Sequence, residues 1–356
     1  MKKVIKIFVP LFMIAFVAII LTSCTSKKAK FEFQYWNDNV TSLNTLTSYV
    51  EDVTNESSKN YIEKDDRIAV FDMDGTLCGE LFPTYLEYLL CAYRCLYDTT
   101  YTATDEMKEV ANQIMEGSKG DGTGTYSSDM PLLHAKTQAQ AFAGLTLAEF
   151  ETYVKNFLKH NADGFNNMTY ADSLYLPMIE VVTYLQENDF LTYIVSGSDR
   201  FICRAFASEK LNIPYNQVIG MDVSLVASNQ GDTDGLDYKY SSEDKLVRGS
   251  DLIIKNLQMN KVKQIAKEIG KQPVLSFGNS SGDYSMHKYT ITGNEHKSAA
   301  FMLIADDETR DYGNTTKNTE LGTKWTEAGF NVISMKNDFK TIYGENVTKT
   351  ELKYTF

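Results

Sequence analysis

The spacing of apolar positions changes midway along the chain, and in the first half it is mainly helical. Residues 40–54 carry apolar side chains on one helical face, and residues 81–163 are helix-like around a glycine-rich loop at residues 117–124. Thr146 and Glu149 have the spacing of a capping box, which marks the start of a helix. The first half is therefore expected to be largely α-helical.

Short apolar runs typical of buried strands appear at residues 68–71 and again throughout the second half. The later strands are expected at residues 191–195, 217–225, 273–277, 299–304 and 332–335, and the helices between them at residues 178–186, 201–210 and 262–270. Strands separated by helices of this length predict a parallel sheet covered on both faces. We therefore expect an α/β fold, a Rossmann-like parallel sheet core with an inserted α-helical cap.

The N-terminus has the pattern of a targeting segment. Three lysines within the first six residues precede an apolar run at residues 7–21, which suits a signal peptide and is short for a bilayer-spanning helix. The residues that follow, Leu-Thr-Ser-Cys ending at Cys24, resemble a bacterial lipobox. We expect residues 1–23 to be a lipoprotein signal peptide and Cys24 to carry the lipid. The alternative is an uncleaved membrane anchor, and either one places the folded part outside the cytoplasm on a bacterial membrane.

Composition narrows the class of protein. The chain has 356 residues, of which 43% are hydrophobic and 23% charged, values ordinary for one elaborated globular domain or two smaller ones. Its formal net charge is −12, and it becomes −15 without the lysine-bearing residues 1–23, which hold no acid. Such an acidic balance argues against a nucleic-acid partner and against electrostatic adhesion to an anionic membrane.

Cysteine and histidine offer no zinc pattern. Apart from Cys24 the chain has four cysteines, which in an exported protein could form zero, one or two disulfides. It has four histidines, and neither a C-x-x-C nor an H-E-x-x-H pattern occurs. A zinc site is therefore not expected.

Two carboxylates follow the first predicted strand directly. Asp72 and Asp74 are spaced i, i+2 and precede Gly75, which allows the backbone to turn away. At the carboxyl end of a buried strand, both side chains can face the crevice in which ligands bind in open α/β sheets. The alternative is an Asp-Gly turn with two solvated acids.

Three further polar features follow later strands. Ser196 and Gly197 offer a hydroxyl group and backbone N–H groups suited to an anion, and Lys261 opens a predicted helix. Asn279 and Asp283 follow the strand expected at residues 273–277. Each feature alone is more often a turn or a solvated face, so only their combination is informative.

In this order the features resemble the motifs of the haloacid dehalogenase (HAD) superfamily of phosphatases. Residues 72–76 read D-M-D-G-T, matching its first motif, and Ser196 and Lys261 fall at the second and third. Asp283 matches the fourth motif, but Asn279 stands where the family has an acid. The likeness extends over residues 35–343 and is greatest to exported, phosphoserine-phosphatase-like lipoproteins.

The resemblance implies a division of the chain. Residues 24–66 would be a tether and N-terminal helical extension, and residues 67–80 and 176–356 would form the catalytic core. Residues 81–175 would form the helical cap that selects the leaving group.

The resemblance also implies the catalytic roles. Asp72 would attack phosphorus to form an aspartyl-phosphate, and Asp74 would act as general acid and then as general base. A magnesium ion would be held by Asp72, by the backbone carbonyl of Asp74 and by Asp283, with Asn279 coordinating weakly or through water.

The phosphoryl oxygens would be held by Ser196, Gly197 and Lys261. Lys261 has two neighbours that could compete for this role, Lys255 and Lys263. The family places its lysine at a helix start before an apolar residue, which favours Lys261.

Three residues are weaker candidates for selecting the substrate. Glu80 stands near the place where phosphoserine phosphatases read an amino group, and Arg200 and Arg204 match basic positions near the phosphate. The tyrosine-rich cap would suit a cationic head group, although packing of the cap explains these tyrosines equally well.

The sequence therefore predicts a Mg²⁺-dependent phosphomonoester hydrolase acting on a small phosphorylated metabolite of the phosphoserine, phosphocholine or phosphoethanolamine class. The alternative is a surface lipoprotein that keeps the fold and only binds a ligand. Dehalogenation is disfavoured because it needs neither Asp74 nor Asp283, and phosphotransfer to an alcohol stays open.

Overall fold

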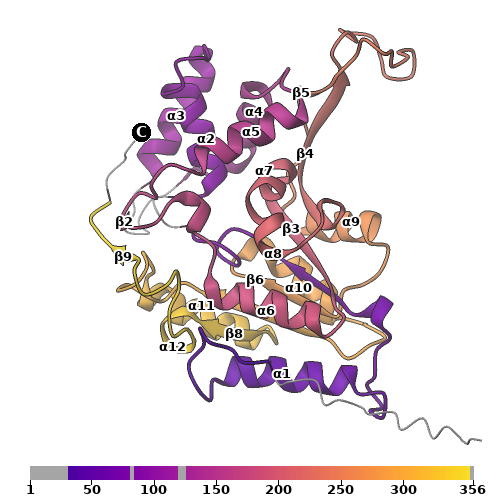
Figure 1. Ribbon diagram of the computed structural model, residues 1–356, viewed down its shortest axis with the longest axis vertical. Helices are drawn as coiled ribbons and strands as arrows, with labels where there is room; N and C mark the ends of the chain where they lie inside the picture. The colour runs from indigo at the N-terminus through magenta and orange to yellow at the C-terminus, as the bar shows by residue number, and fades with distance from the viewer. Residues whose placement is uncertain (1–30, 81–83, 119–125, 353–356) are drawn as a thin grey trace, which may run out of the picture. The chain divides into compact units, whose positions relative to one another are not determined.

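The computed structural model describes residues 31–80, 84–118 and 126–352 (Figure 1). The predicted signal peptide, Cys24 and most of the glycine-rich loop lie outside these ranges. The chain divides into two compact units, Met1–Glu32 and Phe33–Phe356, and the second is described below. Among the described residues, no helix combines the length and hydropathy needed to span a bilayer.

A seven-stranded sheet forms the centre of this second unit, with the strand order β5-β4-β3-β1-β6-β7-β8. The strands are β1 (Ile68–Phe71), β3 (Leu191–Asp199), β4 (Val218–Ala227), β5 (Leu246–Ile254), β6 (Leu275–Gly278), β7 (Ala299–Ile304) and β8 (Asn331–Ser334). Six of them run parallel, so the predicted α/β core with its parallel strands is confirmed. One edge strand, β5, is not among the strands predicted from the sequence, and it pairs antiparallel with β4.

The chain winds outward from β1 in both directions. It passes first to β3 and β4 and then returns to build β6, β7 and β8 on the other side of β1. The carboxyl end of β1 therefore lies where the winding direction reverses, the usual ligand-binding position in open α/β sheets.

Helices cover both faces of the sheet, as expected. The core helices are α1 (Thr41–Thr54), α6 (Leu176–Glu187), α7 (Arg200–Cys203), α8 (Glu209–Leu211), α9 (Met259–Glu268), α10 (Tyr284–Ile291), α11 (Thr315–Glu327) and α12 (Met335–Asp338). Ile265 of α9 and Met286 of α10 pack on Val70 and Val195, and Trp325 of α11 packs further along the same face. Helix α6 packs against β3.

The helix expected at residues 201–210 is present, but it is interrupted. A π-helical turn at Arg204–Ser208 separates α7 from α8. Short 3₁₀ turns occur at Lys64–Asp66, Tyr170–Asp172, Tyr215–Gln217 and Ser281–Asp283. The four described cysteines, Cys78, Cys91, Cys95 and Cys203, are free and buried thiols.

Four helices are inserted between β1 and α6. They are α2 (Leu86–Leu96), α3 (Asp105–Gly117), α4 (Met130–Ala141) and α5 (Leu147–Phe157). The capping box that the sequence predicts at the start of α5 is present, since Thr146 and Glu149 each accept the other's backbone N–H. The two connections to the core lie side by side, because the Gly79 N–H donates to the Ser173 carbonyl at 3.0 Å.

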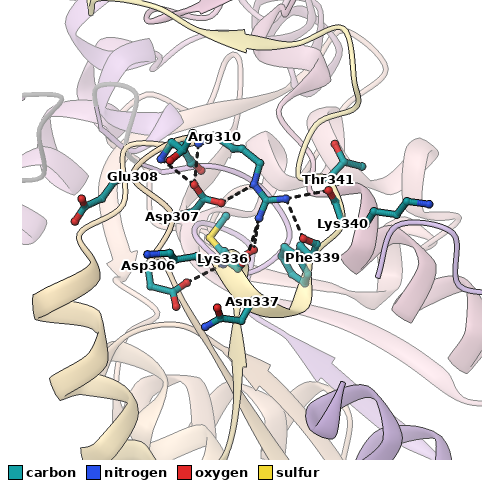
Figure 2. A network of polar contacts seen from close by, with 12 residues as sticks. Asp306, Asp307, Glu308, Arg310, Lys336, Asn337, Phe339, Lys340 and Thr341 are labelled. Atoms are coloured by element: carbon teal, nitrogen blue, oxygen red, sulfur yellow. Dashed lines mark hydrogen bonds and ion pairs between the residues drawn. The ribbon is translucent and has the colours of Figure 1, made fainter. Parts of the chain in front are cut away.

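The C-terminal segment returns to both parts of this unit. Strand β9 (Thr348–Lys349) pairs with β2 (Phe165–Asn166), which follows the inserted helices. Figure 2 shows how the backbone at residues 335–340, which precede β9, is held. The Arg310 guanidinium donates to the backbone carbonyls of Met335, Lys336, Phe339 and Lys340. Arg310 also pairs with the Asp307 carboxylate.

A row of stacked aromatic rings crosses the centre of the sheet. Phe71 on β1 lies parallel to Phe277 on β6, with ring centroids 4.4 Å apart, and Phe277 stacks on Phe301 of β7 at 5.1 Å. All three side chains are buried. Because Asp72 directly follows Phe71, and Asn279 follows Phe277 after one glycine, this packing fixes the height at which β1 and β6 end.

We predict that Phe301→Ala lowers the free energy of unfolding by about 3–5 kcal/mol, because it removes a buried ring and leaves a cavity in the stack. Urea denaturation followed by circular dichroism measures this loss. Leu236→Ala is the control, since Leu236 is 96% exposed and its truncation should change stability by less than about 0.5 kcal/mol. Equal stability of the two variants would contradict the assigned role of the stack.

Candidate active site

The loop after β1 makes a tight turn that only glycine fits. The Met73 carbonyl accepts the N–H groups of Thr76, Leu77 and Cys78, and Gly75 adopts a φ of +76°. A Cβ atom on Gly75 would lie 1.9 Å from the Asn279 amide nitrogen. The turn therefore keeps the two acids of this loop close to the loop that follows β6.

Lys261 joins two of the carboxylates that the sequence singles out. Its ammonium group donates to Asp72 Oδ1 at 2.5 Å and to Asp283 Oδ1 at 2.6 Å. All three side chains are buried; Asp72 directly follows β1, Lys261 lies in the first turn of α9, and Asp283 lies in the 3₁₀ turn after β6. Lys263, its near neighbour in sequence, donates instead to Asn260 at an exposed position.

The pKa values of the two carboxylates in this cluster are shifted in opposite directions. Burial and the nearby Asp283 carboxylate raise the pKa of Asp72 to about 8, although Lys261 opposes this shift. Burial acts in the same direction on Asp283, but there the charge of Lys261 outweighs it and lowers the pKa. Burial alone would lower the pKa of Lys261, yet the two carboxylates raise it above its usual value. The lysine is therefore charged at neutral pH.

Asp74 lies beside this cluster and contacts the end of β3. Its Oδ2 accepts a hydrogen bond from the Ser198 hydroxyl at 2.6 Å and lies 3.5 Å from the Ser196 hydroxyl. Its Oδ1 is buried and has no hydrogen-bond partner among the described residues. Burial raises the pKa of Asp74 to about 6, against the Ser198 hydrogen bond and with a further rise from Glu87.

The predicted phosphate-binding segment is adjacent to these acids. Gly197 and Ser198 line the cavity described below, whereas Ser196 lies behind them and accepts the Ser198 N–H at 3.0 Å. A Cβ atom at Gly197 would lie 2.6 Å from Leu257 Cδ2, so the Leu257 side chain would have to move to admit it. Asn256 fixes the segment by donating to the Ser196 carbonyl at 2.9 Å.

Backbone N–H groups of the loop after β6 hold the Asp283 carboxylate in place. Asp283 Oδ2 accepts the N–H groups of Asn279 and Ser280, each at 3.1 Å. The Asn279 side chain turns toward Glu80 and donates to its Oε1 at 2.9 Å. Burial and the charges of Asp74 and Asp72 raise the pKa of Glu80 well above its usual value.

A cavity of about 90 Å³ brings these groups together. Its walls combine acids and lysines of the core with side chains of the inserted helices. The lining residues are Asp72, Asp74, Glu80, Tyr85, Glu87, Tyr88, Pro131, Gly197, Ser198, Lys255, Leu257, Lys261, Asn279, Ser280 and Asp283.

Three of the sequence candidates do not line this cavity: Ser196, which lies behind Gly197 and Ser198, and two arginines. Arg200 forms ion pairs with Asp222 at 2.7 Å and with Glu268 at 2.6 Å. Arg204 donates to the Tyr215 carbonyl at 2.9 Å. Neither arginine is among the residues that line the cavity.

Sequence reasoning missed Ser198, Glu87 and the position of Lys255. Ser198 was detectable as the residue two positions after Ser196, on the same face of a strand. Glu87 gave no signal, because an acid on a helix is usually solvated. Here it is buried, and its carboxylate accepts the Lys255 ammonium at 2.6 Å and the Asp199 N–H at 3.0 Å.

The donor atoms fit a hard divalent cation. Asp72, Asp74 and Asp283 supply only oxygen ligands, and the buried Asp74 Oδ1 still lacks a partner among the described residues. Among the described residues, no group of three or more acidic, histidine or cysteine side chains is placed to hold a metal ion by itself. Mg²⁺ does not require such a group, since it typically binds through one or two carboxylates and keeps several waters.

No model of a known protein family and no curated protein matches the chain. Solved structures do resemble it. A conserved functionally unknown protein from Anaerococcus prevotii is 14% identical over 82% of this chain and 91% of its own, with a TM-score of 0.49. A protein with unknown function from Bordetella pertussis is 13% identical over 75% and 97%, with a TM-score of 0.47.

A phosphoserine phosphohydrolase-like protein from Francisella tularensis is 14% identical to this chain. The match covers 72% of this chain and 92% of that protein, with a TM-score of 0.38. Function is therefore inferred below from the side chains of the site.

We predict that Lys261→Met lowers the free energy of unfolding at pH 7.5 by about 3–5 kcal/mol, because it leaves two buried carboxylates without their cation. The deficit relative to wild type should shrink toward pH 5. Without the lysine the pKa of Asp283 rises, so the folded variant takes up protons as the pH falls. Urea denaturation at both pH values measures this, with Lys263→Met as the exposed control. An unchanged deficit at pH 5 would contradict the prediction.

Proposed function

We propose that this protein is a metal-dependent phosphomonoester hydrolase that acts through an aspartyl-phosphate on Asp72. The observation that carries the proposal is the Lys261 ammonium, which joins Asp72 to Asp283 with Asp74 beside them at the carboxyl end of β1. A nucleophilic carboxylate, a second carboxylate and a fixed cation are the groups that such a reaction needs. The order of these residues along the chain, which resembles the HAD motifs, supports the same reaction.

In the first step, an Asp72 oxygen attacks phosphorus while the bond to the alcohol oxygen breaks. Asp74 donates its proton to the leaving oxygen, which leaves the enzyme as an alcohol. In the second step, Asp74 removes a proton from a water molecule that attacks the phosphorus of the intermediate, and the bond between phosphorus and the Asp72 oxygen breaks. Inorganic phosphate leaves, and both aspartates return to their starting states.

Several groups hold the transferring phosphoryl group. Lys261 supplies a positive charge next to Asp72, and the Gly197 backbone at the cavity wall would supply an N–H donor. Ser196 supports this segment from behind through its contact with the Ser198 N–H. These groups orient the phosphoryl group and neutralise its charge.

Mg²⁺ is the proposed cofactor. Asp72, the Asp74 carbonyl and Asp283 would hold it, with Asn279 reaching it weakly or through water. When bound, the ion supplies charge neutralisation for the phosphate and for the crowded acids. The Asn279 side chain, which bonds to Glu80, would have to turn to contribute directly.

The proposed substrate is a small phosphorylated metabolite of the phosphoserine, phosphocholine or phosphoethanolamine class. Support comes from the cavity of about 90 Å³, which leaves room only for a small leaving group. Glu80 and the rings of Tyr85 and Tyr88 line it, so an acid and aromatic surface are both available. Arg200 and Arg204 are less suitable as selecting residues, because both are engaged elsewhere.

We also propose export to a bacterial membrane, with a lipid on Cys24. Support comes from the sequence alone, from the apolar run at residues 7–21 and the lipobox-like residues after it. The substrate would then be met outside the cytoplasm.

We predict phosphomonoesterase activity on a panel of small phosphate esters with Mg²⁺ present, abolished by EDTA and restored by added Mg²⁺. Asp72→Asn should lower kcat by about 10³-fold or more, because the amide cannot act as the nucleophile. Asp237→Asn, at an exposed position, is the matched control and should keep full activity. An inactive wild type across the panel would instead favour a lipoprotein that only binds its ligand.

We predict that kcat/KM for alkyl phosphates falls above about pH 6, because Asp74 must carry a proton to release the alcohol. For p-nitrophenyl phosphate, whose leaving group needs no proton, this fall should be much weaker. Ser198→Ala should move the alkaline limb to higher pH, because it removes a hydrogen bond that favours the charged carboxylate. A shift to lower pH would contradict the assignment of Asp74.

A further inference from the structure

A second lysine lies in the cavity apart from the nucleophile. Five of the lining side chains are acidic, and within the described lining only Lys255 and Lys261 are basic. The Lys261 ammonium group already donates hydrogen bonds to Asp72 and Asp283. Lys255 is therefore the cation that can act on another part of the substrate.

The connection that carries Lys255 is built to hold it in place. The Lys255 carbonyl accepts the Asn260 side-chain amide at 2.9 Å, and the next residue, Asn256, bonds to the end of β3. The Gln258 N–H donates to the Gly282 carbonyl at 2.9 Å. Gln258 has a φ of +54°, a conformation that a glutamine adopts only when its surroundings enforce it.

The Lys255 ammonium group is held by a side chain of the inserted helix α2. Glu87 on α2 accepts it at 2.6 Å, and the second oxygen of this carboxylate accepts the Asp199 N–H. The Lys255 side chain is 12% exposed and that of Glu87 is 3% exposed. Among the described residues this is the one hydrogen bond of the ammonium, so further N–H groups remain for a ligand.

The position of this pair relative to Asp74 shows which part of the substrate it faces. Glu87, which holds Lys255, accepts the N–H of Asp199, and the residue before it, Ser198, donates its hydroxyl to Asp74. Asp74 is the proposed acid for the alcohol oxygen, whereas Lys261 lies at Asp72, where phosphorus is attacked. Lys255 therefore lies on the leaving-group side.

We infer that Lys255 is a specificity-determining residue that binds an anionic group of the leaving alcohol. The inference rests on the proposed function and narrows its substrate class to phosphate esters of small hydroxy acids, with a carboxylate near the ester oxygen. An ammonium in the same place would meet the like charge of Lys255. Choline and ethanolamine esters are correspondingly disfavoured.

The test compares three esters of similar size: phosphoglycolate with an anionic leaving group, 2-hydroxyethyl phosphate with a neutral one and phosphoethanolamine with a cationic one. Wild type should show the highest kcat/KM for phosphoglycolate and the lowest for phosphoethanolamine. Lys255→Met should lower kcat/KM for phosphoglycolate by about 10- to 100-fold, the effect of one charge-assisted hydrogen bond, and change the neutral ester by less than about threefold. Lys255→Arg should restore part of the loss.

Lys263→Met is the control variant, because Lys263 is exposed and bonds only to Asn260 among the described residues. It should leave all three esters unchanged. An equal loss on all three esters in Lys255→Met would overturn the inference, because the lysine would then act on the shared phosphoryl group. Preferred cleavage of phosphoethanolamine by wild type would also overturn it.

Calorimetric binding separates this inference from the proposed function. Asp72→Asn with Mg²⁺ should bind phosphoglycolate about tenfold or more tightly than 2-hydroxyethyl phosphate, and addition of Lys255→Met should remove the difference. If wild type hydrolyses no ester but this preference is present, the proposed function fails and the inference stands. If no such preference is present, the inference fails.

Discussion

The rest of the site depends on one buried cluster of charges, in which Lys261 pairs with both Asp72 and Asp283. Carboxylates this close cannot remain ionised out of water without a cation, and Lys261 meets both within 2.6 Å. The cluster can form only if β1 and β6 end at matching heights and α9 begins beside them. The stacked rings of Phe71 and Phe277 set those heights from below. Packing of the core thus determines the electrostatics of the cavity.

The inserted helices complete the cavity instead of merely covering it. Glu87 on α2 reaches the core, where it holds Lys255 and the Asp199 N–H. His134 on α4 lies within 3.6 Å of the same carboxylate, but burial lowers the pKa of this imidazole to about 4, so it adds no charge at neutral pH. Movement of the inserted helices would therefore change the charge that the leaving group meets, and leave the phosphoryl-binding groups in place.

Much of the fold could be predicted because its strands are short apolar runs between helices of regular spacing. Strand β5 could not, because its Arg248-Gly249-Ser250-Asp251 centre has no alternating pattern and its pairing with β4 depends on contacts distant in sequence. In the site, the acids and the lysine were predictable from their order along the chain. The resemblance already favoured Lys261 over Lys263, and the contacts supply the physical reason, because Lys261 donates to Asp72 whereas Lys263 donates to Asn260.

The sequence by itself determined the chemistry available: two acids on one turn, a serine-glycine segment, a lysine and a further acid, each placed after an apolar run. It also determined that Gly75 had to be glycine, as its place after two acids implied. Only the tertiary structure decided which charges meet. Lys255 and Glu87 are 168 positions apart, and Arg200 turned to Asp222 and Glu268, because ion pairing depends on distance in space, which local pattern does not encode.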